Sequence, residues 1–547
     1  MATAVGPLPQ ITSERIEPEA RGWTSWITTT DHKRIGILYM VTTFVFFCLG
    51  GVEALMMRLQ LGSPNNTLVT PQVYNQLFTM HGSTMIFLFV VPMLAGLANY
   101  FLPLMIGARD MAFPRLNAAS LWLLILGGLV MYLGFVWGGG AADAGWTAYP
   151  PLSVQSPGHG IDLWIVGLHI LTVSSVIGAV NFICTIHNMR APGMRLTRMP
   201  LFVWTIEVYA FMLLLALPLL SGALTMLLLD RNYGTTFYAA GHYGPLLYQH
   251  LFWAFGHPEV YVVALPGFGM ISEIVPVFSR KPLFGYRALV YATVAIAFLA
   301  FLVWGHHMFA VGMSTPLQTW FMLTSMAIAV PTGVKIFNWV GTMWMGQIRF
   351  EPPMLFATGF ILVFLIGGLS GIALAVFPFD LYVTDSYFVV AHFHYVMGSV
   401  PVFAVLGGLH YWYPKMTGRM LDRSLAIKSF WVLFVGFNLT FFPMHAMGLS
   451  GMPRRVATYT DPGWNVYNQI ATVGAFVLAI GVLLVLINCL RSLRAGRIAP
   501  ADPWGGYTLE WYTSSPPPPH NFDSLPPIRS ERPLDDLRRA AAAEARA

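Results

Sequence analysis

Two histidines lie two residues apart inside a long apolar segment, in the stretch VVAHFHY at 389–395. On an α-helix, positions i and i+2 point about 200° apart, so the His392 and His394 imidazoles should face opposite sides of one helix. If both bind metal, they therefore belong to two different centres. Ionisable groups inside membrane-length segments are costly and usually functional, which favours metal ligands over hydrogen-bonded core histidines.

Four further histidines in apolar segments could complete these centres: His81, His257, His306 and His307. Six imidazoles can be divided among two haems and one copper. One haem iron would take two axial histidines, and the other would take one and keep an open position for a small ligand. The three remaining imidazoles suit a copper that is also open on one side. An open iron facing an open copper could bind O2 between them.

Composition places the chain in a membrane. Of its 547 residues, 56% are hydrophobic and only 10% are charged, whereas soluble domains are about 25% charged. The net charge of +6 is small and spread over loops, so it does not indicate a nucleic-acid partner. Cys48, Cys184 and Cys489 are far apart, which excludes a disulfide framework, an iron–sulfur set and a thiolate copper centre in this chain.

Twelve segments contain the roughly 20 apolar residues that a membrane span needs. The sequence therefore predicts an all-α integral membrane protein, with twelve transmembrane helices in one bundle. The segments are 35–58, 76–104, 118–138, 161–188, 201–229, 246–276, 287–308, 317–347, 354–377, 386–413, 426–449 and 465–492. We expect an N-terminal segment at 1–30, the helical domain at 31–497, and a Pro-rich tail at 498–547 that is extended and partly disordered.

Lysine and arginine concentrate in alternate loops, which places those loops and both termini in the cytoplasm. Only Arg231, Arg454 and Arg455 depart from this pattern. The orientation puts all six histidines in one layer nearer the outer face. Scattered structural histidines would rarely share a depth, so the common layer supports a joint metal-binding role.

Three histidine motifs resemble those of subunit I of the haem–copper oxygen reductases: WAFGHPEVY at 253–261, WGHHMF at 304–309 and AHFHY at 391–395. The resemblance runs from about Asp31 to Trp511 and includes DPWGG at 502–506 and LEW at 509–511 in the tail. It is closest to the A-type, proton-pumping branch. It implies the catalytic subunit of a respiratory terminal oxidase that reduces O2 to water, with two haems, expected to be haem A, and one copper, CuB.

The resemblance divides the six histidines among the three metals. It makes His81 and His394 axial to the low-spin haem, and His392 axial to the high-spin haem. It leaves three ligands for CuB: His257, His306 and His307. This division agrees with the opposite faces expected for His392 and His394.

Two side chains close to His257 are expected to take part in the reaction. Tyr261 lies one turn after His257 on the same helix face. In the family this tyrosine is joined covalently to the copper histidine and supplies an electron and a proton during O–O cleavage. Glu259 lies in the middle of an apolar span and should remain protonated there, because burial disfavours the charged carboxylate. A protonated acid is what a proton relay needs.

Two polar routes resemble the proton pathways of the family. The D pathway would start at Asp110, in a basic inner loop, and lead to Glu259. Its other polar positions would be Asn99, Asn117, Ser174, Ser175 and Asn181. The K pathway would use Lys335 and Thr332, which lies one turn before it, and lead towards Tyr261. A lysine at mid-membrane costs at least ~2.5 kcal/mol, so a role is expected for it.

Further residues are expected around the haems. Arg454 and Arg455 would face haem propionates, because paired arginine–carboxylate contacts are strong. Trp146 and Tyr149 resemble the outer cap of the site, and Arg58 resembles the residue beside the ring substituent of the low-spin haem.

One pair departs from the family pattern. A histidine normally precedes an acidic or amide residue eight positions before the high-spin haem ligand, and both help to form an outer magnesium site. Here the pair is Thr384-Asp385. Asp385 could still bind, but the missing histidine puts the magnesium in doubt.

The electron donor depends on a few positions in the first two spans. The quinol branch has an arginine, an acid and a histidine around its quinone, where this chain has Leu49, Glu53 and Val73, with the usual glutamine at Gln76. Two polar groups are missing, which favours cytochrome c over quinol. Electrons would then arrive through CuA in a separate subunit II, with subunit III and small subunits as further partners. A quinol oxidase subunit I remains the alternative.

A twelve-span secondary transporter without a cofactor is the alternative from another class. Transport does not explain six histidines at one depth, and the colour of bound haem would separate the two. The expected location is a bacterial plasma membrane, which the chain crosses several times.

Overall fold

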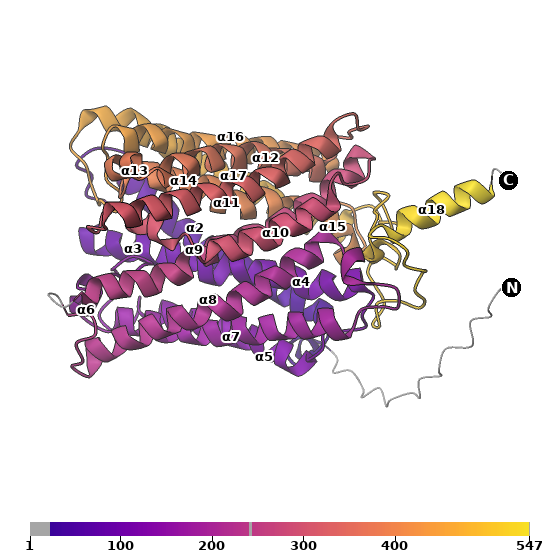
Figure 1. Ribbon diagram of the computed structural model, residues 1–547, viewed down its shortest axis with the longest axis horizontal. Helices are drawn as coiled ribbons and strands as arrows, with labels where there is room; N and C mark the ends of the chain where they lie inside the picture. The colour runs from indigo at the N-terminus through magenta and orange to yellow at the C-terminus, as the bar shows by residue number, and fades with distance from the viewer. Residues whose placement is uncertain (1–21, 240–242, 546–547) are drawn as a thin grey trace.

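The computed structural model describes residues 22–239 and 243–545. Most of the expected N-terminal segment, residues 1–21, and the last two residues of the tail lie outside the described part. Within it, every regular element is a helix, and the only extended pairings are two isolated bridges, Ser386 with Pro453 and Arg419 with Ile498. The long helices run side by side along one axis, as Figure 1 shows. The predicted all-α bundle is therefore confirmed.

Eleven helical runs in the described residues are long and apolar enough to cross a membrane. They are α2 (His32–Gln60); α3 (Pro71–Ser83), η1 (Thr84–Val90) and α4 (Val91–Ile106) as one run; α5 (Pro114–Leu133); α7 (Gly160–Asn188); α8 (Leu201–Asn232); α9 (Gly244–Ser279); α11 (Thr315–Met343); α12 (Pro352–Ala375); α14 (Tyr387–Phe393), η4 (His394–Gly398), η5 (Val400–Val405) and α15 (Leu406–Thr417) as one run; α16 (Arg423–Leu449); and η6 (Pro462–Trp464) with α17 (Asn465–Ala495). The shorter elements are α1 (Thr24–Ile27), α6 (Leu152–Gln155), η2 (Leu196–Arg198), α13 (Phe377–Val383), η7 (Leu509–Trp511) and α18 (Pro533–Glu544).

The seventh expected span, 287–308, is not one regular helix. It consists of α10 (Tyr286–Ala300), which has 15 residues, and a 3-10 turn, η3 (Trp304–Met308). His306 and His307 lie on this turn, and both of their imidazoles face His257 of α9. Among the described residues, α10 is therefore a shorter apolar helix at the place of the expected seventh span, beside the eleven longer runs.

Two of the helical runs are locally π-helical. Segment η1 begins three residues after His81, and η4 begins at His394. π-Helical turns are rare and frequently occur at functional sites. Both histidines expected on the low-spin haem therefore adjoin such a turn, which the hydrophobic pattern of the sequence does not reveal.

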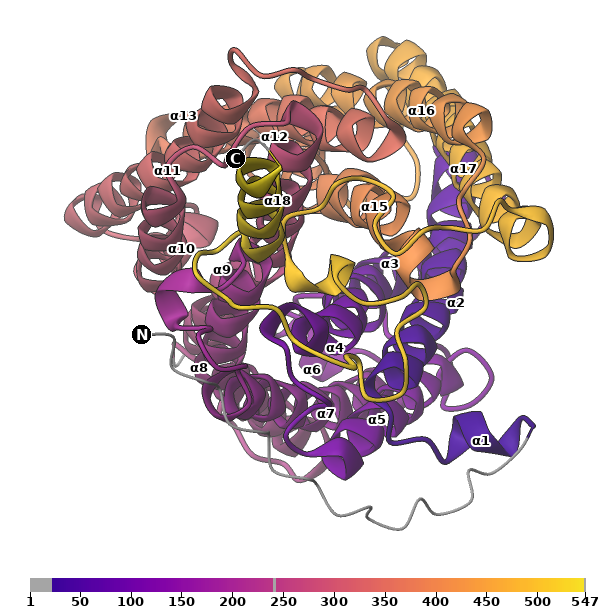
Figure 2. The same cartoon turned by 90° about the vertical axis from the view of Figure 1, so that its right-hand side faces the viewer.

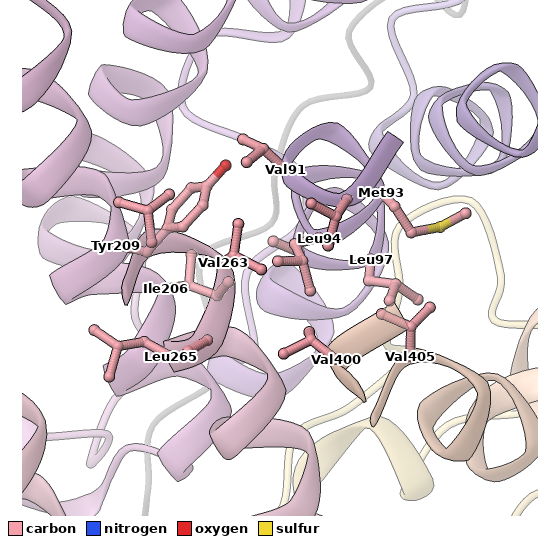
Figure 3. Packing of buried hydrophobic residues seen from close by; sticks show 14 of the residues in the cluster. Val91, Met93, Leu94, Leu97, Ile206, Tyr209, Val263, Leu265, Val400 and Val405 are labelled. Carbon is pink, nitrogen blue, oxygen red and sulfur yellow. The ribbon is translucent and has the colours of Figure 1, made fainter. Parts of the chain in front are cut away.

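The centre of the bundle is built by α4 and α9, most of whose side chains are buried. Figure 3 shows Leu94 and Leu97 of α4 among side chains of α8, α9 and η5. This packing holds the helix that carries His257 against the run that carries His392 and His394. The core thus fixes the relative positions of the histidine-bearing elements.

The tail crosses one end of the bundle, and α18 projects from it (Figures 1 and 2). The Trp504 indole N–H donates to the Tyr411 carbonyl at 2.8 Å, and Lys415 Nζ donates to the Thr513 carbonyl at 2.6 Å. The expectation of partial disorder is therefore wrong for residues 498–545. Trp511 is buried and Trp504 partly buried, and both indole N–H groups donate to Tyr411 of α15, which anchors the segment despite its prolines.

Candidate metal centres and proton pathways

Three imidazole nitrogens converge between α9 and η3. His257 Nδ1 lies 3.0 Å from His306 Nε2 and 3.4 Å from His307 Nε2, and the last two atoms are 3.0 Å apart. Metal–nitrogen bonds of about 2.0 Å at tetrahedral angles would place such nitrogens roughly 3.3 Å from one another. The donor set therefore fits a single metal ion of the kind that imidazole prefers, such as copper.

A serine on α11 orients one of these rings. Ser325 Oγ donates to the Phe321 carbonyl at 2.5 Å, so it can only accept from His306 Nδ1, which lies 2.7 Å away. His306 Nδ1 then carries the ring proton, and its Nε2 presents a lone pair to the cluster. Such partners set ligand basicity and orientation. Sequence reasoning missed Ser325, because a lone serine in an apolar span has no motif.

The other ring nitrogen of His257 is free for a different bond. His257 Nε2 is buried and has no hydrogen-bond partner among the described residues. The His257 and Tyr261 rings lie 4.8 Å apart with an angle of 53° between their planes. An unpartnered nitrogen beside a tyrosine is compatible with the covalent link expected between these two residues.

Trp253 was not among the predicted site residues, yet it contacts the copper cluster. Its ring stacks on His307 with centroids 3.8 Å apart, and its N–H donates to the Tyr149 hydroxyl. Trp146 packs edge-on against it at 5.8 Å. The predicted outer cap, Trp146 and Tyr149, therefore reaches the cluster through Trp253. In the sequence, Trp253 could have been found from its position one turn before His257 on the same helix face.

His392 is held from α12. Its Nδ1 lies 3.0 Å from both the Gly367 carbonyl and the Ser370 hydroxyl, so its Nε2 remains free for a metal. A Cβ at Gly371 would lie 2.8 Å from His392 Cε1, which explains the glycine at this close approach. The His392 ring is near enough to His306 for the two to interact electrostatically, so it lies on the side of the bundle that holds the three converging histidines.

His81 and His394 form a separate pair. His81 Nδ1 donates to the Gly50 carbonyl and His394 Nδ1 to the Val390 carbonyl, each at 2.8 Å, so both Nε2 atoms are free. The two rings interact electrostatically, and the His394 ring stacks on Phe441 of α16 with centroids 4.1 Å apart. His392 and His394 thus contact different neighbours, as their spacing predicted. The pair suits one iron with two axial ligands.

Arg58 carries buried hydrogen-bond donors without acceptors. Its Nη2 donates to Asn468 Oδ1 at 2.8 Å, but its Nε and Nη1 are buried and have no partner in the described part of the chain. Leaving buried donors unpaired is costly. These atoms therefore fit a polar substituent of a bound group beside the His81–His394 pair.

Two adjacent arginines lie on the loop after α16. Arg454 Nε and Nη2 donate to Asp385 Oδ1 at 2.9 and 2.5 Å. Arg455 Nη2 donates to Thr147 Oγ1 at 3.3 Å, and burial together with the charge of Arg454 lowers the pKa of Arg455 to about 10. One carboxylate does not balance two arginines, so the loop retains positive charge that suits haem propionates.

A small cavity, called the polar cavity for the hydroxyl and amide groups in its wall, lies between α2, η1, α4, α5, α7 and α8. Its polar lining residues are Tyr39, Asn99, Ser174, Ser175 and Tyr209. Asn117 adjoins it, because Ser120 Oγ donates to the Asn117 carbonyl at 2.8 Å and Ser174 Oγ donates to the Ser120 carbonyl at 2.6 Å. The structure therefore brings the predicted polar positions of α4, α5 and α7 together.

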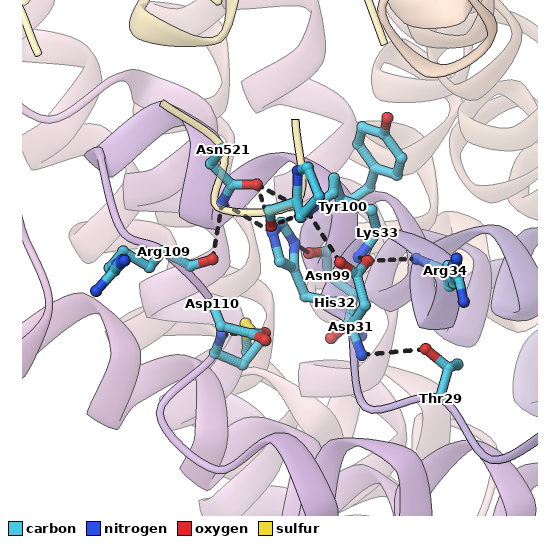
Figure 4. A network of polar contacts seen from close by, with 12 residues as sticks. Thr29, Asp31, His32, Lys33, Arg34, Asn99, Tyr100, Arg109, Asp110 and Asn521 are labelled. Carbon is cyan, nitrogen blue, oxygen red and sulfur yellow. Dashed lines mark hydrogen bonds and ion pairs between the residues drawn. The ribbon is translucent and has the colours of Figure 1, made fainter. Parts of the chain in front are cut away.

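Asp110 and Glu259, the two ends of the predicted D pathway, are not among the residues that line the cavity. Glu259 is 2% exposed, and its Oε2 has no partner among the described residues. It interacts electrostatically with Tyr209, which faces the cavity. Asp110 lies in the loop between α4 and α5, where burial raises the pKa of its carboxyl to about 6. Figure 4 shows Asp110 beside the start of α2.

Lys335 is buried on α11, away from this cavity. Its Nζ donates to Thr293 Oγ1 at 2.6 Å and to the Leu289 carbonyl at 3.4 Å. The Thr332 hydroxyl instead donates to the Ile328 carbonyl at 2.9 Å. The structure thus pairs Lys335 with Thr293 of α10 rather than with Thr332, and sequence spacing could not identify a partner on another helix.

Comparison with known proteins identifies the family. The family described as "Cytochrome C and Quinol oxidase polypeptide I" matches residues 34–477. The chain belongs to this family. The oxidase subunit is 53% identical to the "Probable cytochrome c oxidase subunit 1-alpha" of Streptomyces avermitilis, over 94% of this chain and 89% of that protein. It is 50% identical to the "Cytochrome c oxidase subunit 1" of Corynebacterium glutamicum, over 98% of this chain and 93% of that protein.

A solved structure has the same fold. A heme-copper terminal oxidase dimer, determined by cryo-electron microscopy, matches with a TM-score of 0.73 at 20% identity, covering 86% of this chain and 85% of that one. The oxidase subunit is therefore the catalytic subunit I of a terminal oxidase, an oxidoreductase that works within a complex. It is a multi-pass membrane protein of a family that uses haem and copper, and the transporter alternative is not supported.

Proposed function

We propose that this oxidase subunit reduces O2 to water with electrons from cytochrome c and couples the reaction to proton pumping. The observation that carries the proposal is the convergence of three imidazole nitrogens within 3.0–3.4 Å of one another, close to His392. When bound, two haems of the A type and one copper would transfer electrons and reduce O2 at the centre that has open positions.

The histidines divide among these groups as their contacts suggest. His81 and His394 would hold the low-spin haem, and His392 the high-spin haem. The CuB ligands would be His257, His306 and His307. Each of the three haem histidines donates its Nδ1–H to a backbone carbonyl, which fixes the ring and leaves Nε2 for iron. Arg58, Arg454 and Arg455 would bind polar substituents at the haem edges.

Two routes would bring protons from the cytoplasmic side. Asp110 would take protons up, and the hydroxyl and amide groups around the cavity would order water on the way to Glu259. These groups are Asn99, Asn117, Ser174 and Ser175. Lys335, with Thr293 and Thr332 beside it, would serve the second route towards Tyr261. That tyrosine would give up the proton of its hydroxyl and an electron.

Cytochrome c is the proposed donor, reached through CuA of a subunit II. The relatives quoted above are named cytochrome c oxidase subunits. Leu49 and Val73, where the quinol branch has polar residues, are exposed and apolar, and Glu53 accepts a hydrogen bond from Tyr132 at 3.1 Å. A subunit III, a bacterial plasma membrane and cytoplasmic termini complete the proposal. Because Asp385 is already paired with Arg454, magnesium is not included.

A reduced-minus-oxidised spectrum of the purified complex tests the assignment. We expect haem A bands and carbon monoxide binding to about half of the haem, because only one of the two irons has an open position. Rapid oxidation of reduced cytochrome c should accompany this spectrum. Activity on quinol alone would show that cytochrome c is not the donor. A preparation without haem would contradict the proposed metal centres.

Replacing Lys335 with methionine should slow turnover about 100-fold, because a buried proton-carrying group is lost from the second route. The haem spectrum and copper content should not change, since no proposed ligand contacts this side chain. Lys428→Met, at an exposed lysine on α16, is the matched control and should turn over normally. Normal turnover of the Lys335 variant would remove this residue from the proton route.

A further inference from the structure

One side chain of the tail is built into the region where Asp110 lies. Asn521 follows the last membrane helix by more than twenty residues, yet it is fully buried. Its φ is +70°, a left-handed conformation that asparagine adopts more readily than most residues. A buried amide in this conformation implies that the surrounding contacts hold it in place. Figure 4 shows it between the start of α2 and the loop before Asp110.

The Asn521 amide links two separate elements. On the loop between α4 and α5, Nδ2 donates to the Ala108 carbonyl at 2.9 Å and to the Arg109 carbonyl at 3.2 Å. At the start of α2, Oδ1 accepts from Lys33 Nζ at 2.9 Å. His32 Nε2 lies 2.9 Å from Nδ2. The tail therefore joins the first span to the loop that carries Asp110.

The hydrogen-bond pattern fixes the proton on His32 Nδ1, while Nε2 lies near both polar atoms of Asn521, 2.9 Å from Nδ2 and 3.1 Å from Oδ1. His32 Nδ1 lies 2.7 Å from the Asn99 carbonyl, which can only accept, so Nδ1 carries the proton. In the neutral imidazole Nε2 is then an acceptor and takes a hydrogen bond from Asn521 Nδ2. His32 thus connects Asn521 directly to Asn99, a lining residue of the polar cavity.

The Asp110 loop is held at both ends, from different elements. On its far side, the Ala112 N–H donates to Thr185 Oγ1 and the Phe113 N–H donates to Asn181 Oδ1, each at 2.9 Å. On its near side, Asn521 holds the carbonyls of residues 108 and 109. Asp110 lies between these two attachments. Removing the amide would free the near half of the loop while leaving the far half attached to α7.

Asn521 also holds a charge that acts on Asp110. Burial, with a smaller contribution from the negative charge of Asp31, raises the pKa of the Asp110 carboxyl to about 6. The charge of Lys33 and the backbone N–H groups of Met111 and His32 lower it. Lys33 Nζ is fixed by Asn521 Oδ1, by the Pro519 carbonyl at 3.0 Å and by Asp31 Oδ2 at 3.0 Å. The tail thus holds in place both the Asp110 loop and the Lys33 ammonium group.

From these contacts we infer that Asn521 is a positioning residue for proton uptake: the C-terminal tail holds Asp110 and the start of α2 at the entrance of the polar cavity. The inference rests on the proposed function of Asp110 as the group that takes up protons. The C-terminal tail, which lies outside the membrane domain, would therefore help to determine the rate of proton uptake.

The tail has other anchors, so loss of this amide should not release it. Lys415 Nζ donates to the carbonyls of Thr513 and Ser514 at 2.6 and 3.1 Å, upstream of Asn521. Arg198 Nη1 donates to the Ile528 carbonyl at 3.0 Å, downstream. An Asn521→Ala variant should therefore fold with unchanged haem and copper content, and its activity can be read directly.

The test compares Asn521→Ala with the complete wild-type complex. Loss of the amide should let water reach the loop, which lowers the pKa of Asp110, and should loosen Lys33, which raises it. Burial is the larger cause, so the pKa should fall from about 6 towards its ordinary value. A carboxyl with a lower pKa loses its proton at lower pH. The pH above which turnover declines should therefore move down by about one unit, with an about tenfold loss of turnover at neutral pH. A purely structural role would lower turnover without moving this pH.

The matched control is Asn488→Ala. Asn488 is a buried amide on α17 that bonds the backbone of Asp422 through both of its polar atoms, at 3.0 Å each, far from the cavity lining. Its variant should keep the wild-type pH profile. If both variants shift the profile equally, the effect belongs to general loosening and the inference is wrong.

A double-mutant comparison separates this inference from the proposed function. Asp110→Asn should itself slow turnover, and adding Asn521→Ala should cost little more, because residues that act through one another are not additive. Full additivity would mean that Asn521 acts elsewhere and would overturn the inference alone. Normal turnover of Asp110→Asn would overturn the proposed role of Asp110, and the inference with it.

Discussion

Replacing His306 with alanine is expected to remove copper from the purified oxidase and to leave the low-spin haem spectrum intact. His306 Nε2 lies 3.0 Å from both other converging nitrogens, so its loss opens one side of the donor set. Loss of a partner that only orients a ligand weakens metal binding about 10–100-fold, and loss of a ligand itself should cost more. Metal analysis and the reduced-minus-oxidised spectrum measure the two effects.

The low-spin haem should persist because its two proposed ligands lie on other elements. His81 is on α3 and His394 begins η4, and neither bonds to η3. His250→Ala is the matched control, since His250 lies on α9 two turns before His257 and contacts Trp304 instead of the cluster. Unchanged copper content in the His306 variant, or copper loss in both variants, would contradict the assignment.

Glu259→Gln is expected to retain all metals but to slow turnover about 100-fold and to abolish proton pumping. The amide has nearly the same shape as the acid but cannot pass on a proton, and proton transfer by a positioned group contributes about 10²–10⁴-fold. Glu259 Oε2 has no partner among the described residues, so the substitution should break no hydrogen bond of that atom. Oxygen consumption and proton release from reconstituted vesicles are the measurements.

Glu273→Gln gives the control for Glu259. Glu273 is buried on the same helix, and its Oε1 accepts from the Phe202 N–H at 3.1 Å, a bond that the glutamine oxygen can still accept. This variant should turn over and pump normally. Near-normal pumping by Glu259→Gln would remove Glu259 from the proton route, whatever its effect on the rate.

The sequence by itself determined the class of protein and the types of its ligands. Membrane spans must be about 20 apolar residues long, so hydropathy alone located eleven of the twelve expected segments and set histidines apart as costly exceptions. Coordination chemistry limits which residues can hold haem iron or copper. The spacing of His392 and His394 also predicted their different directions, because helix geometry is local.

Only the tertiary structure decided how those ligands are held. The turn at η3 that brings His306 and His307 together depends on the packing of α9 and α11 beside it. Ser325, Thr293 and Asn521 lie on elements distant in sequence from the groups they contact. Hydrogen-bond partners across helices are set by which faces pack together. The hydrophobic pattern of each span leaves that choice open, because every lipid-exposed face is apolar as well.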